Sequence, residues 1–229
     1  MGLNGGIMES RLSKIIYAFL SIPKTVYFNL VVFGLKGVKL PVFISFKTKI
    51  GEIHKGTIQI DHKISPFLIT FGYGGSKGVV SNKRSEIYLS KHSKIFFRGR
   101  AQFAEGCSIR NDGYIEVGVN SSMNRNSFIS CYNRIEIGNN VVTGWNVSIR
   151  DSDGHYMIKN GIKQKLDAPV RIGNHIWICS YSDILKGVNI PNDCVIAYRS
   201  LVVSSFNEEH VLIGGTPAKV IQQDINWEM

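Results

Sequence analysis

The sequence lacks the cysteine and histidine patterns that build metal centres and disulfide frameworks. Its four cysteines, Cys107, Cys131, Cys179 and Cys194, form no CxxC pair, and no His/Cys cluster has zinc spacing. The six histidines show no set of three suited to one metal ion. We therefore expect no metal, and we expect free thiols in a reducing compartment, which predicts a cytoplasmic protein.

Acidic residues are nearly absent from the first 50 positions, which hold seven Lys/Arg against Glu9 alone. A basic segment favours an anionic partner: a membrane surface, nucleic acid or an anionic ligand. Residues 11–35 are also the most apolar part of the chain, but Pro23 and Lys24 divide them into two pieces shorter than the ~20 residues of a spanning helix. The segment is either a helix packed on the domain or a helix at a membrane interface.

The second half of the chain has neither the 3.6-residue period of a helix nor the 2-residue period of a strand. Instead, every sixth residue is aliphatic and β-branched, in the order Ile172, Ile178, Ile184, Ile190, Ile196 and Val202. A six-residue period is typical of a coil of short strands joined by turns, with one inward aliphatic residue on each flat side. Three sides close one coil, and the coils stack. The sequence therefore predicts an all-β fold, a parallel β-helix.

The six-residue spacing recurs upstream in three triplets: Ile95–Ala101–Cys107, Val117–Met123–Ile129 and Ile137–Thr143–Ile149. The joins after these triplets are ten, eight and twenty-three residues, so we predict that all extra residues enter at one corner of the coil. Such insertions usually mark the binding face of a repeat protein. The longest, residues 149–173, is a polar loop that carries His155. Residues 40–94 predict coils with an irregular spacing.

Several motifs occur in a characteristic order over residues 95–222: IGNNVVTGWNVSI, a polar loop with DGH, VRIGNHIWICS, LKGVNIPND and GGTPAKVI. They resemble the left-handed β-helix (hexapeptide-repeat) acyltransferases of the galactoside/maltose O-acetyltransferase type, and within them the bacterial polysaccharide O-acetyltransferases. The resemblance implies a left-handed parallel β-helix over residues 41–206. An apolar, basic segment expected to be helical (1–40) would precede it, and a C-terminal cap with the PAK motif (207–229) would follow.

The resemblance also implies an activity: acetyl-CoA-dependent O-acetylation of a saccharide hydroxyl in surface polysaccharide (O-antigen or capsule) synthesis. The active sites would lie between the subunits of a homotrimer, with no nucleic-acid partner. His155 matches the catalytic histidine, and a neutral imidazole can take a hydroxyl proton near neutral pH. Asn124 matches the active-site asparagine, although asparagine also suits the left-handed backbone of a turn. Asp151 or Asp153 could orient the imidazole.

CoA would run along the C-terminal coils, past Ser180, Tyr198, Val203, Ser204 and Lys219 by match. Tyr181, Tyr198 and Arg199 stand where relatives often have small residues, so they either narrow the channel or point into solvent. Two alternatives stay open: an N-acetyltransferase acting on an amino-sugar nucleotide, and a non-catalytic β-helix that binds or scaffolds. The membrane alternative for residues 11–35 predicts a peripheral contact with the cytoplasmic face of the inner membrane.

Overall fold

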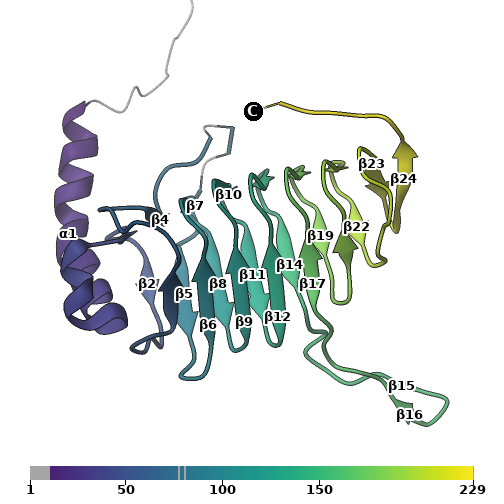
Figure 1. Ribbon diagram of the computed structural model, residues 1–229, viewed down its shortest axis with the longest axis horizontal. Helices are drawn as coiled ribbons and strands as arrows, with labels where there is room; N and C mark the ends of the chain where they lie inside the picture. The colour runs from purple at the N-terminus through teal and green to yellow at the C-terminus, as the bar shows by residue number, and fades with distance from the viewer. Residues whose placement is uncertain (1–10, 77, 80, 229) are drawn as a thin grey trace, which may run out of the picture.

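The computed structural model describes residues 11–76, 78–79 and 81–228; the first ten residues of the expected 1–40 segment lie outside the described residues. Helix α1 (Arg11–Phe33) and the short 3₁₀ helix η1 (Gly34–Lys39) stand at one end of a long coil of parallel strands (Figure 1). The chain then visits three sheets in turn, which makes the domain a parallel β-helix. The structure thus confirms the predicted parallel β-helix.

Three sheets, named A, B and C, form the sides of the coil. Sheet A contains β1 (Val42–Ile44), β4 (Ile69–Phe71), β7 (Ala101–Phe103), β10 (Ser121–Met123), β13 (Val142–Thr143), β18 (Trp177–Ile178), β21 (Val195–Ile196), β23 (Leu212–Gly215) and β24 (Ala218–Gln222). Sheet B contains β2 (Lys49–Ile50), β5 (Glu86–Leu89), β8 (Ser108–Asn111), β11 (Phe128–Cys131), β14 (Ser148–Arg150), β19 (Asp183–Ile184) and β22 (Leu201–Val202). Sheet C contains β3 (Ile58–Ile60), β6 (Lys94–Phe97), β9 (Tyr114–Val117), β12 (Arg134–Ile137), β17 (Val170–Ile172) and β20 (Asn189–Ile190).

The six-spaced aliphatic residues form the core of the coil, as predicted. Ile178, Ile184, Ile196 and Val202 are fully buried, and each stacks on the equivalent residue of the neighbouring coil, as Ile178 does on Ile196. Each coil alone exposes its inward residues to solvent at both ends. Stacking therefore buries a continuous apolar column, which is the reason that the repeat is stable only as an array.

The register predicted for the first triplet is wrong by two residues. Phe97 pairs with Val117, Phe103 with Met123 and Ile109 with Ile129. Phe97, Phe103 and Ile109 therefore stack directly under the second triplet, in the place expected for Ile95, Ala101 and Cys107. Ile95, Ala101 and Cys107 are equally buried, because side chains two apart on a strand face the same side. A spacing of six cannot distinguish these two inward positions. The join to Val117 is therefore eight residues rather than ten.

The prediction that extra residues enter at one corner is confirmed for the three joins after residue 107, whereas the glycine-rich loop between β4 of sheet A and β5 of sheet B enters at another corner. The connections β8–β9, β11–β12 and β14–β17 all lead from sheet B to sheet C. We call this edge the BC corner, and we call the edge formed by the connections from sheet A to sheet B the AB corner. The first two coils, β1 to β6, confirm the irregular coils expected for residues 40–94.

Helix α1 runs without a break through Pro23, so the expected division of the apolar segment into two pieces is wrong. Proline removes one backbone hydrogen bond from a helix. Pro23 lies on the exposed side, and the opposite side packs on β1 through Phe28 and Val32, which are fully buried. Residues 13–39 are, in the described part of the chain, the helical stretch long and apolar enough to cross a membrane, with a mean hydropathy of 1.6.

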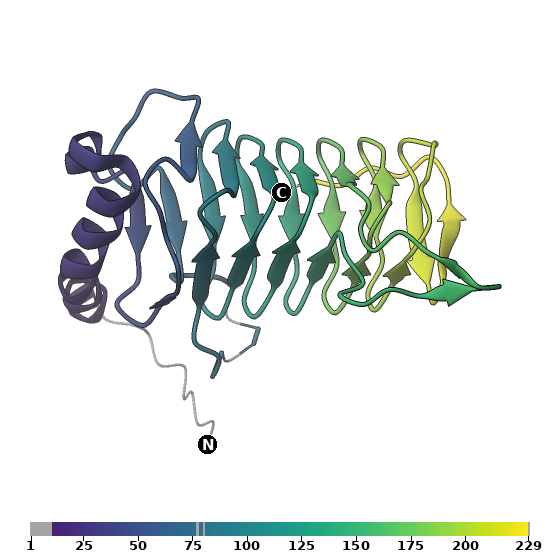
Figure 2. The same ribbon diagram turned by 90° about the horizontal axis from the view of Figure 1, so that it is seen from below.

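The C-terminal end of the coil extends beyond the boundary expected at residue 206. β23 is parallel to β21 and adds one more strand to sheet A, and β24 then returns antiparallel. The last residues run back along the outside of the coil (Figure 2). There the Trp227 ring stacks on His175 at a centroid distance of 4.4 Å, and its indole nitrogen donates to the His175 carbonyl.

Candidate functional site

The long BC-corner loop folds as a hairpin that projects from the coil (Figure 1). Its strands are β15 (Ile158–Lys159) and β16 (Ile162–Lys163), joined by Asn160 and Gly161, which both have positive φ. An Asn-Gly pair with this geometry is a favoured hairpin turn. The hairpin exposes apolar side chains that a polar loop would not have: Tyr156, Met157, Ile158 and Ile162, each more than half exposed.

His155 lies in this loop, five residues after the end of β14, and its side chain is exposed. Among the residues that the structure describes, none forms a hydrogen bond or ion pair with its imidazole. The ring is therefore available to a group that comes from outside this chain.

Asp151 does not orient His155 within one chain. Its carboxylate is fully buried and accepts hydrogen bonds from the backbone nitrogens of Tyr132, Asn133 and Arg134, each at 2.7 Å. These contacts hold the β11–β12 turn of the coil below. Three charge-assisted bonds from backbone N–H groups satisfy a buried carboxylate, so Asp151 fixes the base of the loop.

Asp153 also has another partner than His155. Its carboxylate pairs with the Lys186 Nζ at 2.5 Å. The same ammonium donates to the Lys165 carbonyl at 2.6 Å. Lys186 thus ties both ends of the hairpin insertion to the next coil, and both aspartates serve the position of the loop.

Asn124 lies at the AB corner, directly after β10, and a glycine-rich loop covers it. The Ser76 backbone nitrogen donates to the Asn124 Oδ1 at 3.1 Å, and the Asn124 Nδ2 donates to the Ser76 Oγ at 2.9 Å. The Trp145 indole nitrogen donates to the same hydroxyl at 2.7 Å. Ser76 therefore joins two successive coils at this corner.

The glycine-rich segment FGYGGSKG makes this close approach possible. A Cβ on Gly78 would collide with the Trp145 ring, and Gly75, at φ +102°, has no room for a Cβ beside Ala104. Arg125 holds the loop by donating to the Val79 carbonyl at 2.7 Å. An open hollow of about 260 Å³ lies beside Asn124, lined by Gly75, Ser76, Gln102, Ala104, Ser122, Met123, Asn124 and Thr143. No local sequence pattern indicates Ser76, because its partners lie 48 and 69 positions away along the chain.

Two of the CoA candidates lie on the same corner as Asn124, in later coils. Ser180 follows β18 and Tyr198 follows β21. The Ser180 hydroxyl accepts a hydrogen bond from the Trp145 backbone nitrogen at 2.9 Å, so it also closes a turn. The AB corner therefore presents Asn124, Trp145, Ser180 and Tyr198 in ascending order.

Tyr181, Tyr198 and Arg199 point outward and form one cluster on this corner. The two tyrosine rings meet edge to face at 5.6 Å, and the Arg199 guanidinium lies within 5.6 Å of both ring centroids. Tyr198 is 56% exposed. The bulky residues thus line the outside of the corner and do not enter the core.

The remaining CoA candidates lie elsewhere. Val203 and Ser204 follow β22 and belong to the BC corner, and Lys219 is an exposed residue of β24. Within one chain the structure also separates His155 from Asn124, because the first lies at the BC corner and the second at the AB corner. A single chain therefore keeps these two candidate residues apart, and we call their two positions the candidate half-sites.

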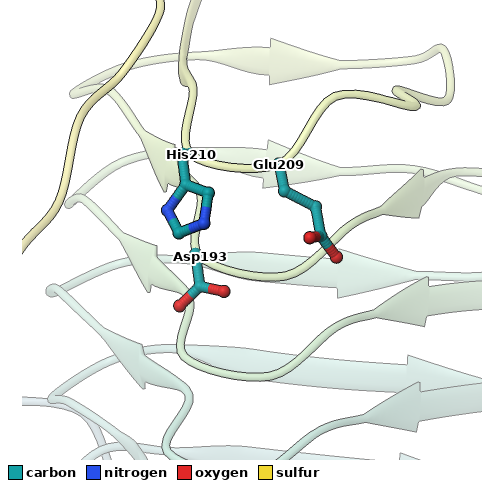
Figure 3. Close-up of side chains that lie close together, drawn as sticks. All are labelled: Asp193, Glu209 and His210. Carbon is teal, nitrogen blue, oxygen red and sulfur yellow. The ribbon is translucent and has the colours of Figure 1, made fainter.

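Histidine spacing in the sequence does not reveal one group of potential metal ligands. Asp193, Glu209 and His210 bring their ligand atoms within 4.8 Å of one another (Figure 3). Two of them already have partners: Asp193 with His175 Nδ1 at 2.8 Å, and Glu209 with Asn192 Nδ2 at 2.6 Å. Asp193 is half-buried in the turn between β20 and β21, and the exposed Glu209 and His210 lie in the segment before β23, away from both half-sites.

The surroundings of the four cysteines disfavour a reactive thiol. Burial raises the pKa of Cys107 to about 12, and burial together with the Asp151 charge also raises the pKa of Cys131. Burial raises the pKa of Cys179 and Cys194 as well. A thiol with a raised pKa carries little thiolate near neutral pH, so nucleophilic catalysis by these residues is disfavoured.

Known proteins resemble this chain in sequence and in fold. No family model matches it. A protein of Klebsiella pneumoniae described as an uncharacterized 24.8 kDa protein in the cps region is 32% identical over 148 residues, or 64% of this chain and 63% of the relative. Galactoside O-acetyltransferase of Escherichia coli K12 is 32% identical over 112 residues, or 48% of this chain and 54% of the relative. The alignments thus span less than two thirds of these relatives.

The structure of the polysialic acid O-acetyltransferase OatWY superposes with a TM-score of 0.53 and 22% identity, covering 82% of this chain and 87% of that one. The chain shares the fold of this acetyltransferase and has sequence relatives among the O-acetyltransferases, so the resemblance predicted from the motifs is confirmed. More narrowly, its homologues are galactoside and polysialic acid O-acetyltransferases.

Proposed function

We propose that this protein transfers the acetyl group of acetyl-CoA to a hydroxyl of a saccharide. The proposal rests on the arrangement of residues at the AB corner. The Asn124 amide lies beside an open, polar hollow, and Ser180 and Tyr198 lie in later coils at the same corner, along the expected CoA path. Sequence kinship with galactoside O-acetyltransferase supports this assignment.

The acceptor that we infer is a surface polysaccharide or a precursor of one. The hollow beside Asn124 is open and has mainly polar walls, which suits a sugar with many hydroxyls. A related protein lies in a cps region, and a fold neighbour acts on polysialic acid. The second of these supports a saccharide acceptor.

We infer that the active protein is a homotrimer of left-handed coils. The separation of His155 and Asn124 onto two corners supports a shared site, in which the hairpin of one subunit reaches the AB corner of the next. The exposed apolar side chains of the hairpin also favour a contact, since Ile158 and Ile162 are 72% and 67% exposed. The His155 imidazole, which has no partner among the described residues, would then face the neighbour's hollow.

The proposed chemistry is direct transfer. The His155 imidazole removes the proton of the acceptor hydroxyl as its oxygen attacks the acetyl carbonyl carbon. A hydrogen-bond donor at the AB corner stabilises the resulting oxyanion. The carbon–sulfur bond then breaks, the imidazolium returns its proton to the leaving thiolate, and the products are the acetyl ester and free CoA. No group on the protein is acetylated in this sequence.

The experiment that tests the proposal measures CoA release and acetylated product with acetyl-CoA and a panel of saccharides and amino-sugar nucleotides. Ester formation on a saccharide is the expected result. Turnover of amines alone would establish the N-acetyltransferase alternative. Calorimetry with CoA provides the second measurement: absence of binding at millimolar CoA would leave only a binding or scaffold role.

We also infer a cytoplasmic location. Cys107, Cys131, Cys179 and Cys194 are all unpaired, as expected in a reducing compartment.

A further inference from the structure

The outward side of helix α1 is a continuous apolar surface. Its side chains are between 42% and 76% exposed: Ile15, Ile16, Phe19, Leu20, Tyr27 and Leu30. Pro23 is also exposed and lies among them. Isolated exposed apolar residues are ordinary, but a contiguous helical face of this kind marks an interaction surface. We call this set the α1 face.

The α1 face carries no charge. Lys24 is the only charged residue between positions 15 and 35. Its ammonium turns toward the domain, where it donates to the carbonyls of Phe46 and Thr48 at 2.6 Å each. A helix side exposed to water normally carries charged residues. A side without charge is better suited to an apolar environment than to water.

The geometry of the fold directs the α1 face outward along the coil axis. In a β-helix the hydrogen bonds between coils run parallel to the axis. The side chains of Ser21, Thr25 and Asn29 make equivalent bonds to the backbone of residues 42–46. Helix α1 therefore covers the end of the coil as one more layer, and its opposite side looks away from the molecule (Figures 1 and 2).

A basic hollow adjoins the α1 face. It has a volume of about 580 Å³ and is lined on one side by Leu20, Pro23 and Tyr27 and on the other by Lys24, Lys49 and Arg84. Lys49 is paired with Glu86 at 2.9 Å. Within the described part of the chain, no carboxylate forms an ion pair with Lys24 or Arg84. Burial and the charge of Arg84 lower the pKa of Lys24, as expected where positive charge is uncompensated.

We propose that this end of the coil docks on an anionic membrane, with the α1 face in the boundary between headgroups and acyl chains and a lipid phosphate in the basic hollow. Apolar contact beside cationic groups is the combination that a phospholipid surface complements. Exposed Lys14, Lys36 and Lys39 flank the face at its two ends. A second copy packed face to face would bring two basic hollows together, and the repulsion disfavours that occupant.

Docking at this end places the coil axis upright on the membrane. The His155 loop belongs to the fifth coil, so at ~4.8 Å for each coil it stands about 20 Å above the first. In a parallel trimer all three α1 faces lie at the same end, which multiplies the attachment. The catalytic half-sites remain in water, so activity on a soluble acceptor is independent of docking.

The test is sedimentation of the full chain with vesicles of phosphatidylcholine alone or with added phosphatidylglycerol. The wild type is expected to bind the anionic vesicles and to bind neutral ones much less. Phe19→Asp, at a residue 76% exposed, is expected to weaken binding at least about tenfold. Ile221→Glu is the matched control, because Ile221 is 59% exposed but lies at the opposite end of the molecule.

The basic hollow has its own pair of variants. Arg84→Glu and Lys83→Glu make the same change in net charge at adjacent exposed positions, and only Arg84 lines the hollow. The proposal requires a several-fold larger loss of anionic-vesicle binding for Arg84→Glu. Equal losses would overturn the phosphate site, and wild-type binding by Phe19→Asp would overturn docking through α1. Sedimentation velocity is the third measurement. If the wild type does not bind vesicles but self-associates with rising concentration, and Phe19→Asp abolishes that association, the α1 face would be assigned to a second copy of the chain.

Discussion

Asn29 of helix α1 and Val42 of strand β1 are joined by two hydrogen bonds. The Asn29 Nδ2 donates to the Val42 carbonyl at 2.6 Å, and the Val42 backbone nitrogen donates to the Asn29 Oδ1 at 3.1 Å. One amide side chain thus takes the place of a neighbouring strand. Thr25 repeats the arrangement at Ile44, four residues along the helix and two along the strand. An open edge strand is a template for aggregation, and this polar row closes it.

Asn29→Ala is expected to lower the free energy of unfolding by about 2–3 kcal/mol, because it leaves both backbone groups of buried Val42 without a partner. Denaturant unfolding followed by circular dichroism measures the loss. Leu30→Ala, on the exposed side of the same helix, serves as the control and should change stability by less than about 0.5 kcal/mol. Similar effects for both variants would show that the pair does not protect the edge.

His155→Ala is expected to reduce kcat by about 10²–10⁴-fold, because a general base contributes a factor of this size. The affinity for CoA should be nearly unchanged. Initial rates with acetyl-CoA and calorimetry with CoA separate the two quantities. His92→Ala removes another exposed histidine and should have wild-type kinetics. Parallel loss of turnover and CoA affinity in His155→Ala would assign the loop a structural role.

Mixing two inactive variants tests whether the site is shared between subunits. If His155 and Asn124 come from different chains, trimers reassembled from equal amounts of His155→Ala and Asn124→Ala should regain about one quarter of the wild-type sites. Specific activity before and after unfolding and refolding of the mixture measures the gain. No recovery, with trimers confirmed by sedimentation, would place both residues in the same chain's site.

Trp145→Phe tests the contact between the glycine-rich loop and the AB corner. The substitution keeps an aromatic ring against Gly78 but removes the donor to the Ser76 hydroxyl. Loss of this bond should loosen the wall of the hollow and raise KM for the acceptor several-fold, with KM for acetyl-CoA less affected. Trp177→Phe is the control, because Trp177 packs near Trp227 at the C-terminal end. An unchanged acceptor KM would separate the loop from acceptor binding.

The raised pKa of Cys107, about 12 against 9.0 for an unperturbed thiol, predicts a pH dependence of stability. The folded state keeps this thiol neutral, so its contribution is complete below pH 9 and declines as pH rises from 9 toward 12. The decline should be roughly 1 kcal/mol between pH 9 and pH 10. The difference in unfolding free energy between wild type and Cys107→Ala across this range isolates the effect. A constant difference would contradict the buried neutral thiol.

Much of the fold was predictable because its signal is local. Six-residue spacing from Ile172 to Val202 is a property of each coil, and the three upstream joins identified the BC corner. The site was predictable only in part. The sequence singled out His155 by its place in the longest insertion, but it could not show that Asp151 serves a turn in the coil below, since that depends on stacking of segments about 20 residues apart.

The sequence alone determined the repeat, the inward aliphatic residues from Ile172 to Val202 and the corner that accepts the insertions after residue 107, because each follows from the spacing of residues along the coils. Tertiary structure decided what depends on contacts between distant segments. Packing on β1 keeps α1 continuous through Pro23, stacking selects Phe97 over Ile95 for the main column, and the glycine-rich loop covers Asn124. Above all, the triangular cross-section puts His155 and Asn124 on different corners, because the connections that carry them join different pairs of sheets.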